Sequence, residues 1–228
     1  TQWTIASYLA RMQYSYKGKY MASGAIRADG SSRFGKNNRW GYFPSASLAW
    51  RVSGEDFFTK AKFLSFVDDL KIRTSYGVTG NFQIGNYDHL SLMALDNYIL
   101  GTGNGQLVQG YKPNTIKNDD LSWEKNAMVN VGVDLQMFKG LLGITVDYYN
   151  TNTSNMLLNV SVPHQTGYST ALMNIGKANN RGWEIALTSQ KNFTKDFGYS
   201  FNANYATNTN AVKALGPGNA PIITTGCV

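Results

Sequence analysis

Residues 127–149 read AMVNVGVDLQMFKGLLGITVDYY, and this stretch decides the fold. In its first half, the apolar side chains at positions 127, 129, 131, 133 and 135 alternate with the more polar Asn130, Gly132, Asp134 and Gln136. The second half repeats the alternation from Leu142 to Tyr149. A period of two gathers the apolar side chains on one face of a strand, whereas a helix would scatter them. Because only Phe138-Lys139-Gly140 separates the halves, the pattern predicts a hairpin.

The same alternation recurs along the chain, in segments 10–16, 20–27, 45–51, 70–76, 183–188 and 199–205. With the hairpin, these segments make about eight strands, several of them near the ~10 residues that a tilted strand needs to cross a bilayer. The sequence therefore predicts an all-β protein in which antiparallel strands form the wall of a transmembrane barrel.

The connections between these segments differ in length in a regular way. Segments 16–20, 136–142 and 190–199 are short, whereas 27–42, 78–125 and 151–180 are long and rich in Gly and Asn. Short periplasmic turns and long extracellular loops are typical of outer-membrane barrels. Residues 54–68, on the short side, are rich in Phe and predict a short amphipathic helix at the interface. Aromatic residues flank the short turns, as in an interfacial girdle.

Composition agrees with this interpretation and excludes others. Charged residues are 15% of the chain, below the roughly 25% of soluble domains. The net charge is +7, but the basic residues are spread out, so we expect no nucleic-acid partner. Cys227 is the single cysteine, which excludes an internal disulfide and a cysteine metal site. No apolar run is long enough for a transmembrane helix, and residues 1–20 do not have the pattern of a signal peptide, as is expected of a barrel fragment.

One long block resembles a known family. It comprises residues 27–47, RADGSSRFGKNNRWGYFPSAS, followed by Trp50-Arg51 and by DLKIRTSYGVTGN at 69–81. Two later blocks, LSWEK at 121–125 and NIG at 174–176 continuing to NRGWE at 180–184, belong to the same pattern. Together these blocks resemble the barrel signature of the SusC/RagA family of TonB-linked outer-membrane proteins.

The resemblance implies a 22-stranded barrel with an N-terminal plug, located in the outer membrane. It implies active import of glycans or peptides, with energy passed on by TonB and a SusD-like surface lipoprotein as lid. Since about eight strands leave open edges that lipid does not tolerate, we expect residues 1–228 to be part of a barrel domain that does not fold alone. The plug, the barrel ends and the TonB-contacting N-terminal part are expected to be missing from it.

Two sets of residues are candidates for function. Charged residues on the polar faces of the strands are expected to face the lumen, where they line the path, pair within the wall or grip the plug: Arg11, Arg27, Arg51, Lys71, Arg73, Asp134, Asp147 and Glu184. Loop residues of types that stack on sugars or bind hydroxyls are expected to contact ligand or lid: Arg33, Arg39, Trp40, Tyr98, Asn104, Tyr111 and His164. For the 27–42 loop, the alternative is that Asp29 and the arginines brace the loop itself.

Other classes of protein fit less well. The two histidines, His89 and His164, are far apart and no Gly-x-Ser-x-Gly elbow is present, so we expect no enzyme, catalytic residue, cofactor or metal site. A soluble β-sandwich that binds carbohydrate would share the alternation, but its outer face would carry charge. Within membranes, a passive porin or a siderophore receptor remains the alternative, and the signature block favours the SusC-like transporter.

Overall fold

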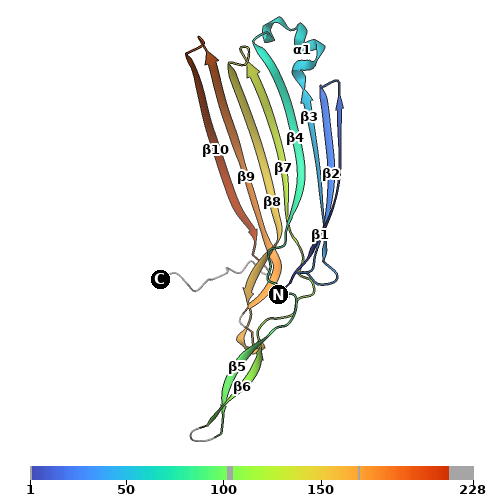
Figure 1. Ribbon diagram of the computed structural model, residues 1–228, viewed down its shortest axis with the longest axis vertical. Helices are drawn as coiled ribbons and strands as arrows, with labels where there is room; N and C mark the ends of the chain where they lie inside the picture. Colours follow the sequence, from blue (N-terminus) through green and yellow to red (C-terminus); the bar gives the residue numbers. More distant parts are fainter. Residues whose placement is uncertain (1, 102–104, 169, 216–228) are drawn as a thin grey trace.

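The protein, represented by a computed structural model, is described for residues 2–101, 105–168 and 170–215, without the side chains of Lys62 and His164. Eight strands form one antiparallel sheet in the order β1-β2-β3-β4-β7-β8-β9-β10 (Figure 1). Their bounds are β1 Ile5–Tyr16, β2 Tyr20–Ser31, β3 Trp40–Arg51, β4 Val67–Asn81, β7 Glu124–Met137, β8 Leu142–Ser161, β9 Thr170–Asn192 and β10 Gly198–Ala214. The predicted wall of about eight antiparallel strands is therefore confirmed.

A second, two-stranded sheet was not predicted. Strands β5 (Met93–Leu100) and β6 (Gln106–Pro113) form a hairpin within the long connection between β4 and β7. This hairpin projects beyond the end of the large sheet (Figure 1). The long loop expected at 151–180 is also wrong in part, because β8 and β9 stay paired as far as Ser161 and Thr170. Between them lies the short 3-10 helix η3 (His164–Thr166).

The register places the apolar residues of neighbouring strands in common rows. One row crosses the sheet from Ile72 through Val133 and Val146 to Ile185. Another runs from Tyr14 through Ala22 to Leu48. Many of these side chains are open to the surroundings, Met12 at 75% and Tyr205 at 63%. Such a face must be covered by another apolar medium, since soluble proteins rarely expose an apolar area this large.

The short connections lie together at one end of the sheet. Gly18 and Gly140 have φ of 65° and 77°, and lie in the tight turns between β1 and β2 and between β7 and β8. Between β3 and β4 the chain forms η1 (Val52–Gly54), α1 (Asp56–Lys60) and η2 (Lys62–Leu64). Within α1, Phe58 is buried while Phe57 is 61% exposed, as the amphipathic prediction requires. No described helix is long and apolar enough to cross a membrane.

Glu55, just before α1, joins the β1–β2 turn, β2 and β3 at this end. Its carboxylate accepts hydrogen bonds from the Tyr20 hydroxyl at 2.6 Å and from Trp50 Nε1 at 3.2 Å. Lys19 Nζ lies 3.2 Å away. The Tyr20 hydroxyl, then the Trp50 indole and Lys19, hold the pKa of Glu55 below its usual range, because these groups stabilise the carboxylate form.

Candidate functional site

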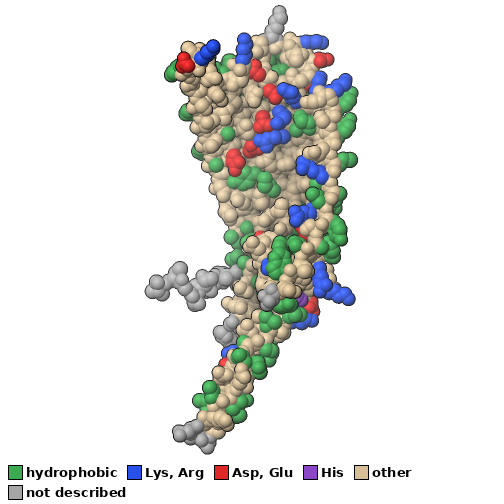
Figure 2. All heavy atoms as spheres, in the orientation of Figure 1, with side chains coloured by type: hydrophobic (Ala, Val, Ile, Leu, Met, Phe, Trp, Pro, Cys, Tyr) green, Lys and Arg blue, Asp and Glu red, His purple; other side chains and the backbone are tan. Residues whose placement is uncertain are grey.

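The polar face of the large sheet is built from the side chains that alternate with the apolar rows. The register sets Lys71 opposite both Arg51 and Asp134, and sets Asp147 opposite Glu184. The charged side chains gather over the half of this face nearest the short connections, where Figure 2 shows them as a band across the strands. All eight predicted charged residues have the strand positions of this polar face: Arg11, Arg27, Arg51, Lys71, Arg73, Asp134, Asp147 and Glu184.

The band is an ion-pair network rather than a set of free charges. Arg73 bridges two strands, with Nη2 2.6 Å from Asp147 Oδ2 and Nε 3.2 Å from Asp134 Oδ2. Lys71 Nζ lies 3.0 Å from the same Asp134 oxygen. Arg51 Nε lies 2.8 Å from Asp69 Oδ1, which also accepts a hydrogen bond from the Ser53 hydroxyl. Pairing within the wall thus occupies most of the predicted lumen charges.

Two carboxylates of the band, those of Asp147 and Glu184, have an oxygen or a charge that no other group of the described residues pairs with. Asp147 Oδ1 is buried without a hydrogen-bond partner, although Oδ2 of the same carboxylate binds Arg73. Glu184, directly across from Asp147, is exposed and has no ion pair among the described residues. Like charges in directly opposite positions repel each other, so the exposed Glu184 carboxylate is favoured to accept a cationic or hydrogen-bond-donating group from the space in front of the sheet.

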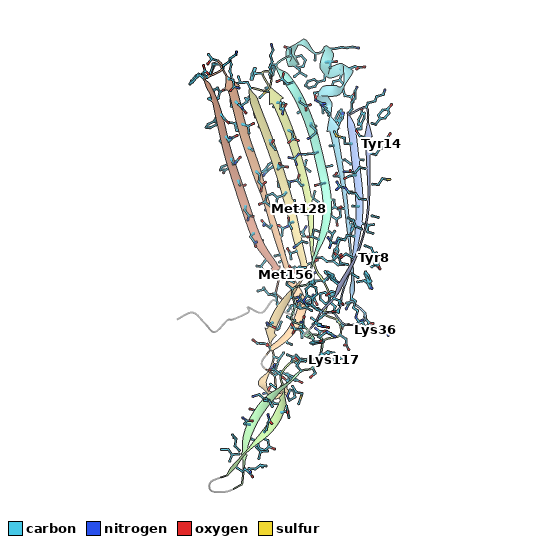
Figure 3. The ribbon with its side chains drawn as sticks, in the orientation of Figure 1. Tyr8, Tyr14, Lys36, Lys117, Met128 and Met156 are labelled. Atoms are coloured by element: carbon cyan, nitrogen blue, oxygen red, sulfur yellow. The ribbon has the colours of Figure 1, made fainter. Side chains whose placement is uncertain are left out.

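Toward the long connections, the same face becomes largely neutral. A groove of about 730 Å³ crosses it, lined mainly by small polar side chains, with two methionines and one charged residue, Glu124. The Ser23 and Ser47 hydroxyls lie 2.8 Å apart, and the Thr153 hydroxyl donates to Asn126 Oδ1 at 2.5 Å. Met128 lies about halfway along the sheet and Met156 nearer the long connections (Figure 3). Hydroxyl and amide groups of this kind bind other hydroxyls and amides without requiring charge.

At the end of the sheet that carries the long connections, the block at 27–47 packs against the other long connections through Trp123. The Trp123 ring lies 5.2 Å from Phe34, 5.4 Å from Phe43 and 5.4 Å from Phe82, between ring centroids. Its Nε1 donates to the Arg39 carbonyl at 3.1 Å. Phe34, Phe43, Ile84, Leu121 and Trp123 together form a buried core. The sequence hypothesis did not single out Trp123, although LSWEK was among the blocks that carried the resemblance.

The third block joins the same core through hydrogen bonds between the Asn174 side chain and backbone groups. Ser122 N donates to Asn174 Oδ1 at 2.9 Å, and Asn174 Nδ2 donates back to the Ser122 carbonyl at 2.7 Å. Asn174 Nδ2 also reaches the Asn155 carbonyl at 2.9 Å. A reciprocal pair of this kind aligns two segments far apart in sequence. It joins residues 174–176 to the buried core that residues 34–43, 84 and 121–123 form, and these segments together make up a loop platform.

Arg33 and Asp29 are part of this bracing. The Arg33 guanidinium stacks 4.4 Å from the centroid of Trp3 and donates to Asn86 Oδ1 at 3.1 Å, while His89 Nδ1 lies 2.9 Å from the Arg33 carbonyl. Asp29 is buried and lies 2.7 Å from Arg27 Nε. These contacts support the bracing interpretation of the loop over one in which Arg33 is free to hold a ligand.

The remaining loop candidates are separated from one another. Trp40 lies on the apolar face, where it stacks on Tyr8 at 5.9 Å, and this position does not fit the predicted contact with ligand or lid. Arg39 is exposed beside it in the chain. Tyr98 and Tyr111 are exposed on opposite faces of the β5–β6 hairpin. Asn104 and the side chain of His164 lie outside the described residues.

An antiparallel sheet with one face that is apolar between cations at its two boundaries, one polar face and a loop platform at one end is a segment of transmembrane β-barrel wall. Residues 1–224 match the family described as TonB dependent receptor-like, beta-barrel. The chain belongs to this family, and its resemblance to the SusC/RagA proteins is confirmed by the relatives described next.

Relatives in sequence and in structure agree. TonB-dependent receptor P39 of Formosa agariphila is 39% identical over 94% of this chain and 20% of its own length. TonB-dependent receptor SusC of Bacteroides thetaiotaomicron is 33% identical over 96% of this chain and 22% of its own. The RagAB peptide importer in its open-open state superposes with a TM-score of 0.82 at 31% identity, over 95% of this chain and 23% of that chain.

The chain thus spans about a fifth of the length of the curated relatives it matches. A siderophore receptor, PirA from Pseudomonas aeruginosa, superposes with a TM-score of 0.57 at 14% identity and shares the fold alone. The family membership sets aside the soluble β-sandwich. Among the described residues, no three His, Cys, Asp or Glu side chains are grouped to hold a metal ion.

Proposed function

We propose that this chain forms part of the wall of a TonB-dependent transporter that imports nutrient oligomers across the bacterial outer membrane. The observation that carries the proposal is the division of one sheet into an apolar face and a polar face, the latter with an ion-pair band at one end and, at the other, a groove in which Glu124 is the one charged lining residue. In this proposal the remaining strands, the plug and the TonB-contacting segment belong to other parts of the complete receptor. The polar face then lines the lumen, and the charged half faces the plug.

For the cargo, we infer a neutral oligosaccharide. The groove near the loop platform presents serine, threonine and asparagine side chains, which match sugar hydroxyls in their capacity to donate and accept. SusC of Bacteroides thetaiotaomicron is among the relatives. A peptide is the second candidate, because the RagAB importer is described as a peptide importer and is 31% identical to this chain. The two methionines of the groove would suit apolar peptide side chains.

We further propose that the β5–β6 hairpin contacts a SusD-like lipoprotein that closes over the barrel. One face of the hairpin gathers side chains that are between 58% and 69% exposed: Met93, Leu95, Ile99, Leu107 and Tyr111. An exposed apolar face on a projecting hairpin is a typical protein-binding surface.

Uptake by cells tests the import proposal. A strain that lacks the complete receptor should fail to take up a labelled oligosaccharide, and the restored gene should rescue uptake. Rescue of peptide uptake alone would favour the second cargo. Uptake that persists without the receptor would contradict the proposal.

Co-purification with the lipoprotein tests the lid proposal. Leu107→Asp places a charge on the apolar face of the hairpin and should reduce recovery of the lipoprotein with the receptor. Leu100→Asp makes the same change at an exposed leucine on the opposite face, so it is the matched control and should leave recovery unchanged. Equal recovery with both variants would contradict the proposed contact.

A further inference from the structure

The side chains on the apolar face of β9 mark where the apolar layer begins and ends. Trp183, Ile185, Leu187 and Ser189 carry no charge, and their apolar partners on β8 are Tyr148, Val146, Ile144 and Leu142. This uncharged run ends at a cation on each side, Arg181 at one end and Lys191 at the other, and both lie on the same face of β9 as the run. They are ten positions apart, which matches the ~9–11 residues of a tilted strand that spans the hydrocarbon core. Arg181 therefore lies at a headgroup boundary, on the side of the long connections.

A pocket of about 290 Å³ opens beside Arg181 on this apolar face. Tyr148, Trp183, Thr207 and Thr209 line it with Arg181. The rings of Tyr148 and Trp183 lie 4.9 Å apart and form its apolar side. Thr207 Oγ1 accepts from Trp183 N at 3.3 Å, so its own hydroxyl hydrogen is free to point outward. The pocket thus has a cation and hydroxyl donors on one side and aromatic rings on the other.

The partners that would neutralise Arg181 within the protein are missing. Arg181 is exposed, and among the residues that the structure describes no carboxylate pairs with it. Its cross-strand neighbour is Asn150, whose Oδ1 accepts from Asn179 at 2.6 Å. This bond leaves the Asn150 amide hydrogens as further donors. A guanidinium with neighbouring donors binds an anionic oxygen group, phosphate above all.

We propose that Arg181 binds the phosphate of a phosphorylated glycolipid of the outer leaflet, of the lipid A type, whose acyl chains lie along Trp183 and Ile185. The proposal rests on the outer-membrane location argued above. The row of amide and hydroxyl donors beside Arg181, from Asn150, Asn152 and Thr209, matches a phosphate carried on a sugar better than one carried on glycerol. Lys125, two strands away on the same face and exposed, is placed to meet a second phosphate of the same lipid.

The experiment uses the complete receptor, purified in detergent, freed of lipid and titrated with purified lipid A. Arg181→Ala should weaken lipid A binding about tenfold, as expected for the loss of one charge-assisted contact. Arg181→Lys should retain part of the affinity, because the charge remains but the paired donors do not. Lys191→Ala removes a cation from the same strand and face at the opposite boundary, and should leave lipid A binding unchanged.

Further probes identify the ligand. Lipid A without its phosphates should bind the unaltered receptor no more tightly than lipid A binds the Arg181→Ala protein. Phosphatidylglycerol that binds as tightly as lipid A would assign the site to an ordinary phospholipid and overturn the glycolipid proposal. Equal lipid A binding by the unaltered receptor and Arg181→Ala would also overturn it. Fractionation of cells separates this from the import proposal: a receptor outside the outer membrane contradicts both, whereas an outer-membrane receptor with unchanged lipid A binding contradicts the lipid site alone.

Discussion

Gly132 lies directly beneath the guanidinium of Arg73. A Cβ at position 132 would come within 2.6 Å of Arg73 Cζ and 2.5 Å of Asp147 Oδ1. The missing side chain therefore creates the space in which Arg73 crosses from β4 over β7 to reach Asp147 on β8. A glycine in the middle of a strand otherwise weakens it, so close approach of other groups is the physical reason for one here.

Gly132→Ala is expected to destabilise the complete receptor, because the added methyl group must displace Arg73 or Asp147. The cost should be about 1–3 kcal/mol, the usual range for overpacking. Urea unfolding in detergent, followed by tryptophan fluorescence, measures it. Gly24→Ala is the matched control, since a Cβ there meets nothing within 4 Å. Equal midpoints for the two variants would show that Arg73 moves aside without cost.

Arg73→Ala should also lower stability, because it leaves Asp147 without an ion pair and Asp134 with Lys71 alone. Since the Arg73 side chain is 32% exposed, solvent screens part of the effect, and about 1–2 kcal/mol is expected in the same unfolding assay. Asp147→Asn added to Arg73→Ala should recover part of the loss, because it removes one unpaired charge. Arg11→Ala, on the same face without an ion pair among the described residues, serves as control.

The strands of the wall could be predicted from sequence because the bilayer imposes period two on them. Segment 127–149 alternates in each of its two halves, and the structure pairs the halves in the register that this alternation requires. The same alternation predicts the face of the sheet on which Trp40 lies. Counted back in steps of two from Leu48, Trp40 falls on the apolar face with Tyr42. Its sequence neighbours Arg39 and Gly41 are typical of a loop, and they favour the interpretation of Trp40 as a loop residue.

The loop platform could not be predicted in the same way. Trp123 and Arg39, joined by a hydrogen bond, are 84 residues apart, and no local pattern encodes such a contact. The β5–β6 hairpin was missed because Asn97 and Gln109 interrupt its apolar face in the middle. Outside the bilayer, a strand can expose polar groups on both faces, so the alternation that marks the wall is weaker there.

The hydrogen bonds to the Glu55 carboxylate predict that the stability of the folded receptor depends on pH. Its pKa is lowered in the folded protein, from an ordinary value of 4.5, so it contributes stability above that value and loses it as the pH falls through the lower, folded pKa. Glu55→Gln should therefore lower the melting temperature at pH 7, and the gap from the unaltered receptor should shrink below about pH 4. Thermal melts from pH 7 to pH 3 measure this. Asp56→Asn, one residue further on, is the control, and a gap independent of pH would contradict the role of the Glu55 carboxylate.

Trp123 is expected to hold the long connections in place, and the two functions of its side chain can be separated. Trp123→Phe keeps a ring against Phe34 and Phe43 but removes the hydrogen bond to the Arg39 carbonyl, at a cost of about 1 kcal/mol. Trp123→Ala removes the packing as well, and should cost about 3–5 kcal/mol. Amide hydrogen exchange of segments 32–39 and 82–92 is the measurement, because local opening exposes these amides before the wall unfolds. Exchange should accelerate slightly in the Phe variant and strongly in the Ala variant, while the amides of β7 and β8 remain protected. If the strands and the loops lost protection together, the platform would be part of the same folding unit as the wall, and loop movements could not occur while the wall stays intact.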